Sequence, residues 1–402
     1  MKPLFLFLNK LITMGSLTWV ESNGKIHTFK GKEPGPDVKL ISKDKKLEWR
    51  LFLNPQLALP EAYMDGRLEI IVNGERTFSK PLLKLLQSNV AKFNYEYKFG
   101  IMNLIARPVN FIKTYNTIAL SSKRVRHHYD VGNDFYKKWL DNDMMYSCAY
   151  FKSGKKTLEE AQYDKKEHIR KKLDLKDGEK VLDIGCGWGG MAIHLAQKNN
   201  VHVTGISLSP EQLKIAKERA EKLQISDKVE FKLCDYRDLK EKFDKIVSIG
   251  MLEHVGKSKL NLYFNCVSNL LDKDGLALIH TISNKRKISD AGPFIRKYIF
   301  PGGYIPTLTD LSKSVTNSGL WMQDLEIWRL HYAKTLEHWH ERFIRNKKEV
   351  IENYDENFFR MWEFYLSGSE TFFSLGAGIV AQIQLGHNRD SAPLDRDYIN
   401  MQ

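Results

Sequence analysis

A glycine-rich turn is the part of this sequence best suited to holding a ligand. The apolar run Val181–Ile184 predicts a short strand, and glycines follow it at positions 185, 187, 189 and 190. Glycine permits positive φ angles and close backbone approach, so a ligand can lie against such a turn. The helix predicted over Met191–Lys198 would point its first N–H groups at the same crevice. The pattern predicts a site for a nucleoside cofactor, and a tight turn without a ligand is the alternative.

The residues around this turn disfavour a dinucleotide. A dinucleotide site has the spacing G-x-G-x-x-G and an acidic residue at the end of the second strand. Here the spacing is G-x-G-x-G-G, and the second predicted strand, 202–206, runs into Ser207 with no carboxylate at its tip. The side chain of Ser207 or Gln212 would then hold the ribose of an adenosine ligand. Gln212 also fits a capping box with Ser209, in which case it serves the helix instead.

Strands and helices alternate in the centre of the chain. A capping box at Thr157 and Glu160 opens a charged helix to about Leu173, and the predicted strands that follow span 180–184, 202–206, 229–233, 245–249 and 276–280. This order is typical of an α/β fold with a doubly wound, mostly parallel sheet. Dense aromatic residues between about 284 and 350 predict a helical lid insertion over the carboxyl edge of the sheet, before a C-terminal helix near 353–368.

The first third of the chain predicts a separate basic domain. Residues 1–120 form a small α+β domain in this interpretation, with strand-like runs at Leu47–Leu53 and Leu68–Val72 and a helical pattern from Lys80; residues 121–402 form the second domain. Residues 1–126 carry 21 Lys and Arg against 10 Asp and Glu, which places +11 of the net charge of +13 there. Such a segment is attracted to polyanions.

The apolar and aromatic stretches Met1–Leu17 and Phe93–Ile112 favour an anionic membrane surface as the partner of this domain. Nucleic acid is disfavoured because no RNP-like or helix-turn-helix motif is present, and a solvated basic surface without a partner is the alternative. The four cysteines form no C-x-x-C pair and no metal-ligand spacing, which indicates a reducing compartment and no metal site. We therefore expect a cytoplasmic protein, peripherally associated with the inner membrane surface. A homodimer is compatible with the sequence, which is silent on oligomeric state.

Four motifs occur together and in order: Tyr146–Tyr150, Leu182–Gly190, Gly250–Gly256 and Lys297–Gly303. With them the chain resembles the cyclopropane-fatty-acyl-phospholipid synthases from about residue 127 to residue 398, and Glu61–Gly66 resembles the amino-terminal domain of the longer bacterial members. The resemblance implies an S-adenosylmethionine methyltransferase fold. It also implies an enzyme that adds a methylene across a cis double bond of a phospholipid acyl chain.

This chemistry needs a dry pocket, because an alkene is a poor nucleophile and must be held close to the sulfonium methyl. Methyl transfer leaves a carbocation, which aromatic faces stabilise by about 2 kcal/mol when desolvated. A base then removes a proton from the new methyl group to close the ring. In the family that the chain resembles, this base is thought to be a bound bicarbonate.

The resemblance assigns the bicarbonate site to Cys148, Glu253, His280, the backbone of Ile282, and Tyr332. Each of these has a structural alternative. Cys148 fits an inert buried thiol, His280 a hydrogen-bonded core histidine, and Tyr332 another aromatic residue of the lid. The neighbouring His254 is predicted to be structural.

The resemblance assigns cofactor binding to Tyr146, Ser147, Asp183, Gly185, Gly187, Gly189, Ser207, Gln212, Asp235 and Tyr236. Asp235 also follows a predicted strand, where its carboxylate can accept from the adenine amino group; an exposed turn residue is the alternative. Cys186 and Trp188 are predicted to pack the turn.

The chain departs from several relatives at Ser369, where they have a cysteine that has been proposed as catalytic. We treat that thiol as dispensable. Two other activities stay open: a methyltransferase that makes a methyl-branched lipid, and one that acts on a soluble small molecule.

Overall fold

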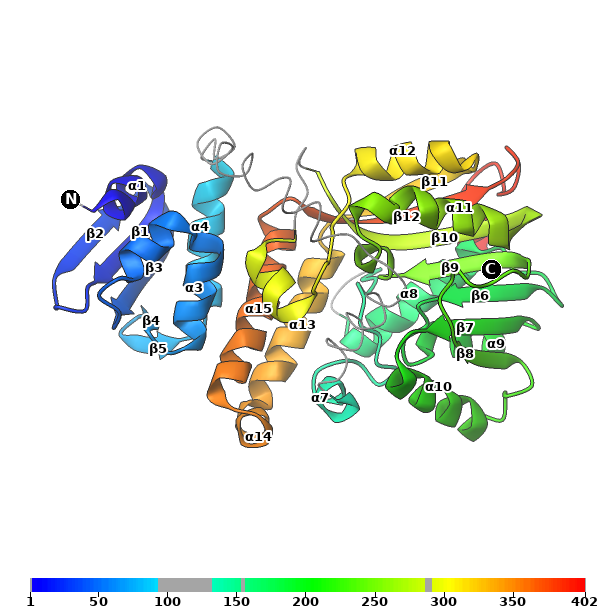
Figure 1. Cartoon of the computed structure of the whole chain (residues 1–402), viewed down its shortest axis with the longest axis horizontal. Helices are drawn as coiled ribbons and strands as arrows, with labels where there is room; N and C mark the ends of the chain where they lie inside the picture. The colour runs from blue at the N-terminus through cyan, green and yellow to red at the C-terminus, as the bar shows by residue number, and fades with distance from the viewer. Residues whose placement is uncertain (1, 93–131, 153–155, 286–290, 402) are drawn as a thin grey trace. The chain divides into compact units, whose positions relative to one another are not determined.

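The protein is described here from a computed structural model, which describes residues 2–92, 132–152, 156–285 and 291–401. The chain forms two compact units. Unit 1 comprises Met1–Val109, Gly292–Ile299 and Leu336–Ala377, and unit 2 comprises Asn110–Ala291, Phe300–Thr335 and Gly378–Gln402. Figure 1 shows the elements of both along the chain.

Unit 2 is built on a seven-stranded sheet in the order β11-β12-β10-β9-β6-β7-β8. The strands are β6 (Lys180–Ile184), β7 (His202–Ser207), β8 (Val229–Leu233), β9 (Phe243–Ile249), β10 (Leu271–Asn284), β11 (Trp321–Trp328) and β12 (Gly378–Gly386). The first five are parallel, and β12 runs antiparallel to both β10 and β11. The five predicted strands and the mostly parallel α/β fold are confirmed.

The last two strands were not predicted. Trp321 and Trp328 were assigned to the lid, but they begin and end β11 at the edge of the sheet. In β12, the buried Gln382 and Gln384 interrupt the apolar run by which a central strand is recognised. Tertiary pairing determines both strands more than their local pattern does.

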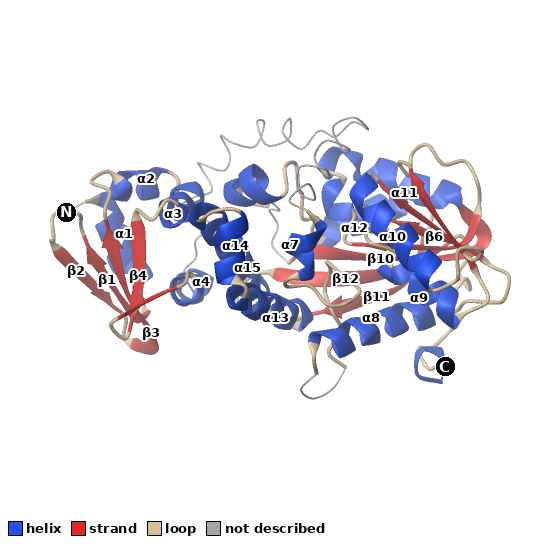
Figure 2. Cartoon of the chain, turned by 90° about the horizontal axis from the view of Figure 1, so that it is seen from below, coloured by secondary structure: helices blue, strands red, loops and turns tan. Residues whose placement is uncertain are grey.

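Helices cover both faces of this sheet (Figure 2). One buried cluster joins α8 (Leu158–Lys172), α9 (Gly190–Lys198) and α10 (Pro210–Lys222) to the sheet, and a second joins α11 (Leu260–Leu270) and α12 (Leu308–Ser318). Adjacent strand residues point to opposite faces, so Val181 belongs to the first cluster and Leu182 to the second. The capping box at Thr157 and Glu160 is confirmed, with both reciprocal hydrogen bonds present.

The remaining elements of unit 2 are short. They are α7 (Asn133–Lys137), η1 (Leu252–His254), η2 (Lys257–Lys259), the first turn of α13 (His331–Arg345), and α16 (Tyr398–Met401). No helix among the described residues is long and apolar enough to cross a membrane.

Unit 1 contains a mixed five-stranded sheet in the order β2-β1-β3-β4-β5. Its strands are β1 (Met14–Val20), β2 (Ile26–Lys30), β3 (Glu33–Ser42), β4 (Leu68–Val72) and β5 (Glu75–Thr77). Its helical elements are α1 (Pro3–Leu11), α2 (Leu47–Leu53), α3 (Pro55–Met64), α4 (Lys80–Lys92), η3 (Ile295–Ile299), α14 (Lys347–Asn353), α15 (Glu356–Ser374) and most of α13.

The strand predicted at Leu47–Leu53 is wrong, because this segment is the helix α2. Leu47 and Leu51, one turn apart, are buried, whereas Trp49 and Leu53 are exposed. The apolar run therefore does not mark a fully buried strand. The prediction at Leu68–Val72 is confirmed by β4, and the stretch Phe93–Ile112 lies outside the described residues.

Unit 1 also takes in parts of the sequence that we assigned to the second domain and its lid. The buried carboxylate of Glu363 on α15 accepts hydrogen bonds from the Tyr63 hydroxyl at 2.7 Å, from Ser79 Oγ at 3.1 Å and from Ser367 Oγ at 2.7 Å. This network ties α15 to the amino-terminal residues, since a buried charge needs such partners. The aromatic-rich segment is thus largely helical but divided between the units, and the boundary predicted near residue 120 falls outside the described residues.

Candidate active site

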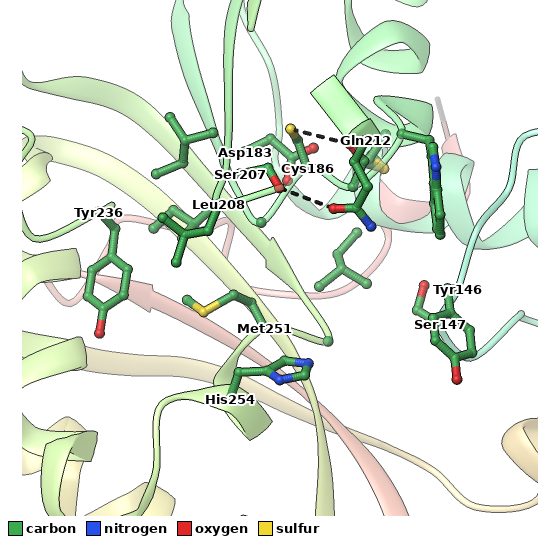
Figure 3. A pocket seen from close by; sticks show the side chains of 18 of the residues that line it. Tyr146, Ser147, Asp183, Cys186, Ser207, Leu208, Gln212, Tyr236, Met251 and His254 are labelled. Carbon is green, nitrogen blue, oxygen red and sulfur yellow. Dashed lines mark hydrogen bonds between the residues drawn. The ribbon is translucent and has the colours of Figure 1, made fainter. Parts of the chain in front are cut away.

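A single pocket at the carboxyl ends of the strands of unit 2 gathers most of the predicted cofactor residues. It encloses about 1120 Å³ of space, part of it open to solvent. In Figure 3, Tyr146 and Ser147 lie on one side, Tyr236 on the opposite side, and Met251 and His254 between them. Of the ten predicted residues, only Gly189 is outside the lining. A site of this size at the carboxyl edge of a parallel sheet fits a nucleoside ligand.

The glycines of the turn after β6 have different structural roles. Gly185, Gly187 and Gly189 all have positive φ, at 82°, 54° and 81°. A Cβ on Gly189 would lie 2.8 Å from the ring of Phe231, so this glycine is needed for packing. A Cβ on Gly187 would meet nothing within 4 Å, and Gly187 lines the pocket. Gly187 is therefore the position at which the backbone leaves room for a ligand.

We expect Gly187→Val to weaken binding of S-adenosylhomocysteine roughly tenfold or more, a loss of about 1.4 kcal/mol. The control is Gly178→Val, because Gly178 also has positive φ and open space around its Cβ but does not line the pocket. Both variants place a β-branched residue at a positive φ, 54° for Gly187 and 82° for Gly178. Isothermal titration calorimetry measures the affinity, and equal binding by the two variants would contradict the assignment.

Ser207 and Gln212 point toward one another at the pocket wall. The Ser207 hydroxyl donates to Gln212 Oε1 at 3.1 Å, while the backbone N–H of Gln212 donates to Ser209 Oγ at 3.3 Å. Only half of the predicted capping box is formed, because the Gln212 side chain turns to Ser207 instead of the cap. Gln212 thus takes part in the helix through its backbone and lines the pocket with its side chain.

Asp235 and Asp183 differ in how their carboxylates are used. Both oxygens of Asp235 accept from the Arg237 guanidinium at 2.7 Å, so this carboxylate is already held in a bidentate pair. Asp183 Oδ2 is buried and has no hydrogen-bond partner among the described residues. Burial raises the pKa of Asp183 to about 7, against the opposing hydrogen bond from the Ala192 backbone. A buried carboxylate in this pocket with one oxygen left without a partner among the described residues fits a ligand that carries positive charge.

Three residues that line the pocket were predicted from the sequence to have only packing or structural roles. Trp188 donates from its indole nitrogen to Asn133 Oδ1 at 2.7 Å, and it lines the pocket together with Cys186. His254 also lines the pocket, edge-on to the ring of Phe300 at 5.5 Å. Burial lowers the pKa of His254 to about 4, so this imidazole is neutral near pH 7.

The segment that carries Tyr146, Ser147 and Cys148 is fixed by helix α8. Gln162 Nε2 donates to the backbone oxygens of Met145 at 3.2 Å and of Ser147 at 3.0 Å. One turn on, Lys165 Nζ donates to Ser147 Oγ at 2.8 Å. From α13, Thr335 Oγ1 accepts from the Ala149 N–H at 3.0 Å. The cofactor pocket and the Cys148 thiol are thereby positioned by the same helix.

Lys165 is a buried charged residue beside the predicted site that was not predicted from the sequence. Its side chain is fully buried, and desolvation lowers its pKa to about 7 against the attraction of Asp141. The signal was present in the sequence: on α8, Gln162, Lys165 and Lys172 stand at helical spacing in the buried stripe with Ile169. A polar residue in the apolar stripe of a helix indicates a buried partner.

Cys148 is fully buried beside this lysine. Its Sγ donates to the Ala149 oxygen at 3.4 Å. Burial raises the pKa of the thiol well above its usual range, against the attraction of Lys165. Cys148 is therefore a protonated thiol and not a thiolate nucleophile.

His280 is held in one tautomer by a chain of buried hydrogen bonds. Lys172 Nζ donates to Gln382 Oε1 at 3.2 Å, which leaves Gln382 Nε2 to donate to His280 Nδ1 at 3.1 Å. Nδ1 is then an acceptor, so the ring proton lies on Nε2. Burial lowers the pKa of His280 well below its usual range, with Lys165 and Lys172 adding to the effect. The imidazole is neutral and offers an Nε2–H donor.

Replacing Gln382 with leucine is expected to lower turnover roughly 10- to 100-fold, because the tautomer of His280 is no longer fixed. Cofactor affinity should be unchanged, since Gln382 is not in the pocket lining. The matched control is Gln384→Leu, two residues along β12, whose buried amide donates to the Lys172 backbone oxygen and not to His280. Steady-state kinetics and thermal unfolding of both variants test this. Equal losses of turnover in the two variants would show that burial of a polar group, and not the tautomer, causes the effect.

Glu253 follows β9 in the short helix η1 and reaches β10. Its Oε1 accepts from the backbone N–H of Ile282 at 2.5 Å, and its Oε2 is buried with no hydrogen-bond partner among the described residues. Burial raises the pKa of Glu253, against hydrogen bonding by the Ile282 backbone and the Thr281 hydroxyl. The Ile282 N–H, which the resemblance assigned to an ion, is thus already engaged by Glu253. Among the described residues, Glu253 Oε2 is a buried acceptor without a hydrogen bond.

The other two positions lie on helices. Tyr332 is on the first turn of α13, three residues before the Thr335 that binds the Cys148 segment, and it is largely buried. Ser369 lies on α15 in unit 1. The described contacts therefore link Cys148, Lys165 and His280 with one another, and Glu253 with Ile282 two residues after His280.

Several known proteins are similar to this chain in sequence and in fold. The family model for mycolic acid cyclopropane synthetase matches residues 118–383. The chain is 37% identical over 350 residues to a probable fatty acid methyltransferase of Pseudomonas putida, covering 85% of each chain. It is 39% identical over 327 residues to the cyclopropane-fatty-acyl-phospholipid synthase of Escherichia coli strain K12, covering 79% of this chain and 80% of that protein.

Among solved structures, the mycolic acid cyclopropane synthase CmaA1 complexed with SAH and CTAB matches with a TM-score of 0.62 and 31% identity. The match covers 66% of this chain and 97% of that chain. The resemblance inferred from the four motifs is confirmed, and so is the methyltransferase fold. The chain belongs to the mycolic acid cyclopropane synthetase family of S-adenosylmethionine-dependent methyltransferases.

Proposed function

We propose that this enzyme methylates a cis double bond in a phospholipid acyl chain and then removes a proton from the added carbon to form a cyclopropane. The observation that carries the proposal is a set of buried polar groups: neutral His280, the Lys165 amine and Glu253 Oε2, which has no hydrogen-bond partner among the described residues. Lys165 binds Ser147 and Glu253 precedes His254, and both Ser147 and His254 line the pocket. A methyltransferase for a ready nucleophile needs no such cluster. Removal of a proton from a methyl group requires a positioned base in a dry site.

S-adenosylmethionine would supply an activated methyl group in the pocket. Its cations fit the unpaired Asp183 carboxylate, and its ribose fits the Ser207 and Gln212 side chains. Asp235 and Tyr236 stand at the opposite wall for the adenine. Gly187 has no side chain, so the cofactor can come close to the backbone of the turn.

Bicarbonate bound in the polar cluster would supply the base. The donor and acceptor set fits this anion, because bicarbonate has negative oxygens and one hydroxyl. The Nε2–H of His280 would donate to it, Lys165 would contribute nearby positive charge, and Glu253 Oε2 would accept from its hydroxyl. Cys148 and Tyr332 would complete the wall of the bicarbonate site, as the resemblance implies. The Ile282 backbone would act indirectly, by holding Glu253 in place.

Aromatic rings close to this cluster support the carbocation chemistry. The Trp328 ring lies 5.0 Å from the ring of His280 and 4.7 Å from that of Tyr150. Uncharged aromatic faces stabilise a positive carbon without trapping it covalently. The phospholipid substrate places the enzyme, in this proposal, in the cytoplasm at the inner membrane surface, to which the net charge of +11 in residues 1–126 would attract it.

The proposal is tested with the purified chain, S-adenosylmethionine and vesicles of cis-unsaturated phosphatidylglycerol. We expect the acyl chains to gain the mass of one methylene, whereas vesicles with saturated chains gain nothing. If no cis-unsaturated lipid gains mass, the proposal is rejected. Methylation of a soluble amine or phenol in the same preparation would then favour the alternative activity on a small molecule.

A further inference from the structure

Helix α2 in unit 1 has a face that no other described part of the chain covers, and it combines aromatic, aliphatic and basic side chains. The exposed fractions of Trp49, Phe52 and Leu53 are 52%, 38% and 61%. Lys46, Trp49 and Leu53 follow the spacing of one helical face, while Leu47, Glu48 and Leu51 on the opposite face are buried. Large apolar side chains exposed side by side are unusual on a soluble surface and indicate contact with an apolar phase.

The inner face of α2 holds the helix rigidly in place. Glu48 is 2% exposed, and its Oε1 accepts from the Trp19 indole N–H of β1 at 3.1 Å. Leu51 packs inward with it. Trp49 and Phe52 lie in a T-shaped arrangement at 6.4 Å. The exposed side chains are therefore fixed in direction by the fold, and are not the free end of a mobile segment.

Basic side chains accompany this face. Lys45 and Lys46, directly before α2, are exposed and form no ion pair within the described part of the chain. Arg50, the residue after Trp49, is also exposed and lies 3.2 Å from Asp44. Each basic residue near an anionic lipid surface contributes about 1 kcal/mol. Trp and Leu between lysines are typical of helices that lie in a membrane interface.

An apolar cavity lies behind the same helix. It encloses about 780 Å³ of space, part of it open to solvent, and every lining residue is apolar. Leu8 of α1, Trp19 of β1, Leu59 of α3 and Leu86 of α4 contribute to the wall. Phe52 both lines the cavity and reaches the surface, so it stands between the two. An apolar cavity of this kind stays dry and takes apolar ligands.

We propose that the exposed face of α2 docks on an anionic phospholipid bilayer and that the cavity behind it accepts one acyl chain of a lipid from that bilayer. This inference rests on the proposed function, because it assigns the surface by which the enzyme reaches its lipid. The occupant follows from the chemistry of the site: a negative headgroup meets Lys45 and Lys46, and a hydrocarbon tail meets the apolar wall. A partner that is only negatively charged would not fill the apolar cavity, and a partner that is only apolar would not pair with the lysines.

Docking is tested by sedimentation of the full chain with phosphatidylglycerol vesicles in the absence of S-adenosylmethionine. We expect the double variant Trp49→Ser, Leu53→Ser to bind roughly tenfold or more weakly. The matched control is Ile26→Ser, because Ile26 is 62% exposed on β2 of the same unit and should not matter. Unchanged vesicle binding by the double variant would overturn the inference. So would a change in oligomeric state with unchanged vesicle binding, which would make this face a contact between copies of the chain.

The cavity is tested with phosphatidylglycerol that carries brominated acyl chains, which quench nearby tryptophans. The difference in quenching between the native protein and Trp19→Phe isolates Trp19, which lines the cavity. We expect Leu86→Phe, which fills the cavity, to abolish this difference while vesicle sedimentation persists. A difference that survives Leu86→Phe would exclude the acyl chain from the cavity. Because neither assay depends on turnover, failure here is distinguishable from failure to alkylate any lipid.

Discussion

Replacing Glu253 with alanine is expected to lower turnover roughly 10²- to 10⁴-fold, the range for loss of a group that positions proton transfer. The physical reason is that Glu253 Oε2 is a buried acceptor without a hydrogen-bond partner among the described residues, while Oε1 fixes the Ile282 backbone at 2.5 Å. Affinity for S-adenosylhomocysteine should be nearly intact, because Glu253 is not in the lining of the cofactor pocket. Steady-state kinetics on vesicles and calorimetric titration measure the two quantities separately.

The companion variant Glu253→Gln separates charge from structure. Glutamine keeps a side-chain oxygen for the Ile282 N–H but removes the negative charge, so we expect native-like thermal stability with low turnover. A large loss of cofactor binding in either variant would contradict the role given to Glu253. Near-native turnover in Glu253→Gln would show that only the hydrogen bond to the backbone matters.

Lys165→Met is expected to lower turnover roughly 10²- to 10³-fold, the loss seen when one group that stabilises charge is removed from a dry site. Lys165 is fully buried, donates to Ser147 Oγ at 2.8 Å, and brings positive charge close to Cys148 and His280. The control is Lys171→Met on the same helix, because Lys171 is half-buried and lies outside this cluster. Equal activity of the two variants would contradict the role of Lys165.

The same variant has a signature in the pH dependence of stability. The pKa of Lys165 is lowered by burial from 10.5 to about 7 in the folded protein. Between these pH values the unfolded chain binds more protons than the folded chain, so the free energy of unfolding should rise with pH across this window. Below about pH 7 the cost of burying the charge is fully present. Chemical denaturation at several pH values should show a smaller rise in Lys165→Met than in Lys171→Met, and identical slopes would be incompatible with a buried, titrating lysine.

The pH dependence of turnover distinguishes a role of Lys165 in anion binding from a purely structural role. An anion bound beside Lys165 favours its protonated form and so raises its pKa. Added bicarbonate should therefore extend the turnover of the native protein to higher pH and leave the pH profile of Lys165→Met unchanged. A merely structural lysine would give no such shift.

The cofactor half of the site could be predicted because its signals are local. The glycine turn after β6 and the polar residues that follow β7 and β8 stand where parallel strands end, so the topology brings them to one pocket. Gly189 is the exception among the predicted residues, since it packs against Phe231 behind the turn. Local sequence does not show on which side of a turn a given glycine lies.

The contacts around His280 could not be fully predicted, because they are long-range or lie on a helix with an ambiguous pattern. Gln382 is 102 residues from His280 in sequence, and nothing in the local pattern of β12 indicates that its amide fixes an imidazole. Lys165 and Lys172 lie on a helix rich in charge, which is usually a solvated face. The run Leu47–Leu53 shows the reverse case: its apolar residues predicted a strand, but several of them are exposed on a helix. Apolar content alone does not indicate burial, because much of a folded protein's surface is itself apolar.

The most direct test of the account follows the hydrogens of the transferred carbon. With S-adenosylmethionine whose methyl group carries three deuterons, and cis-unsaturated phosphatidylglycerol as acceptor, the account predicts an acyl product with a cyclopropane that retains two of the three, since ring closure removes one. Mass spectrometry of the released acyl chains reports this count. A product that keeps all three deuterons as a methyl branch, or no labelled lipid at all, would contradict the claim that the buried cluster around Glu253 and His280 serves to remove a proton from the added carbon.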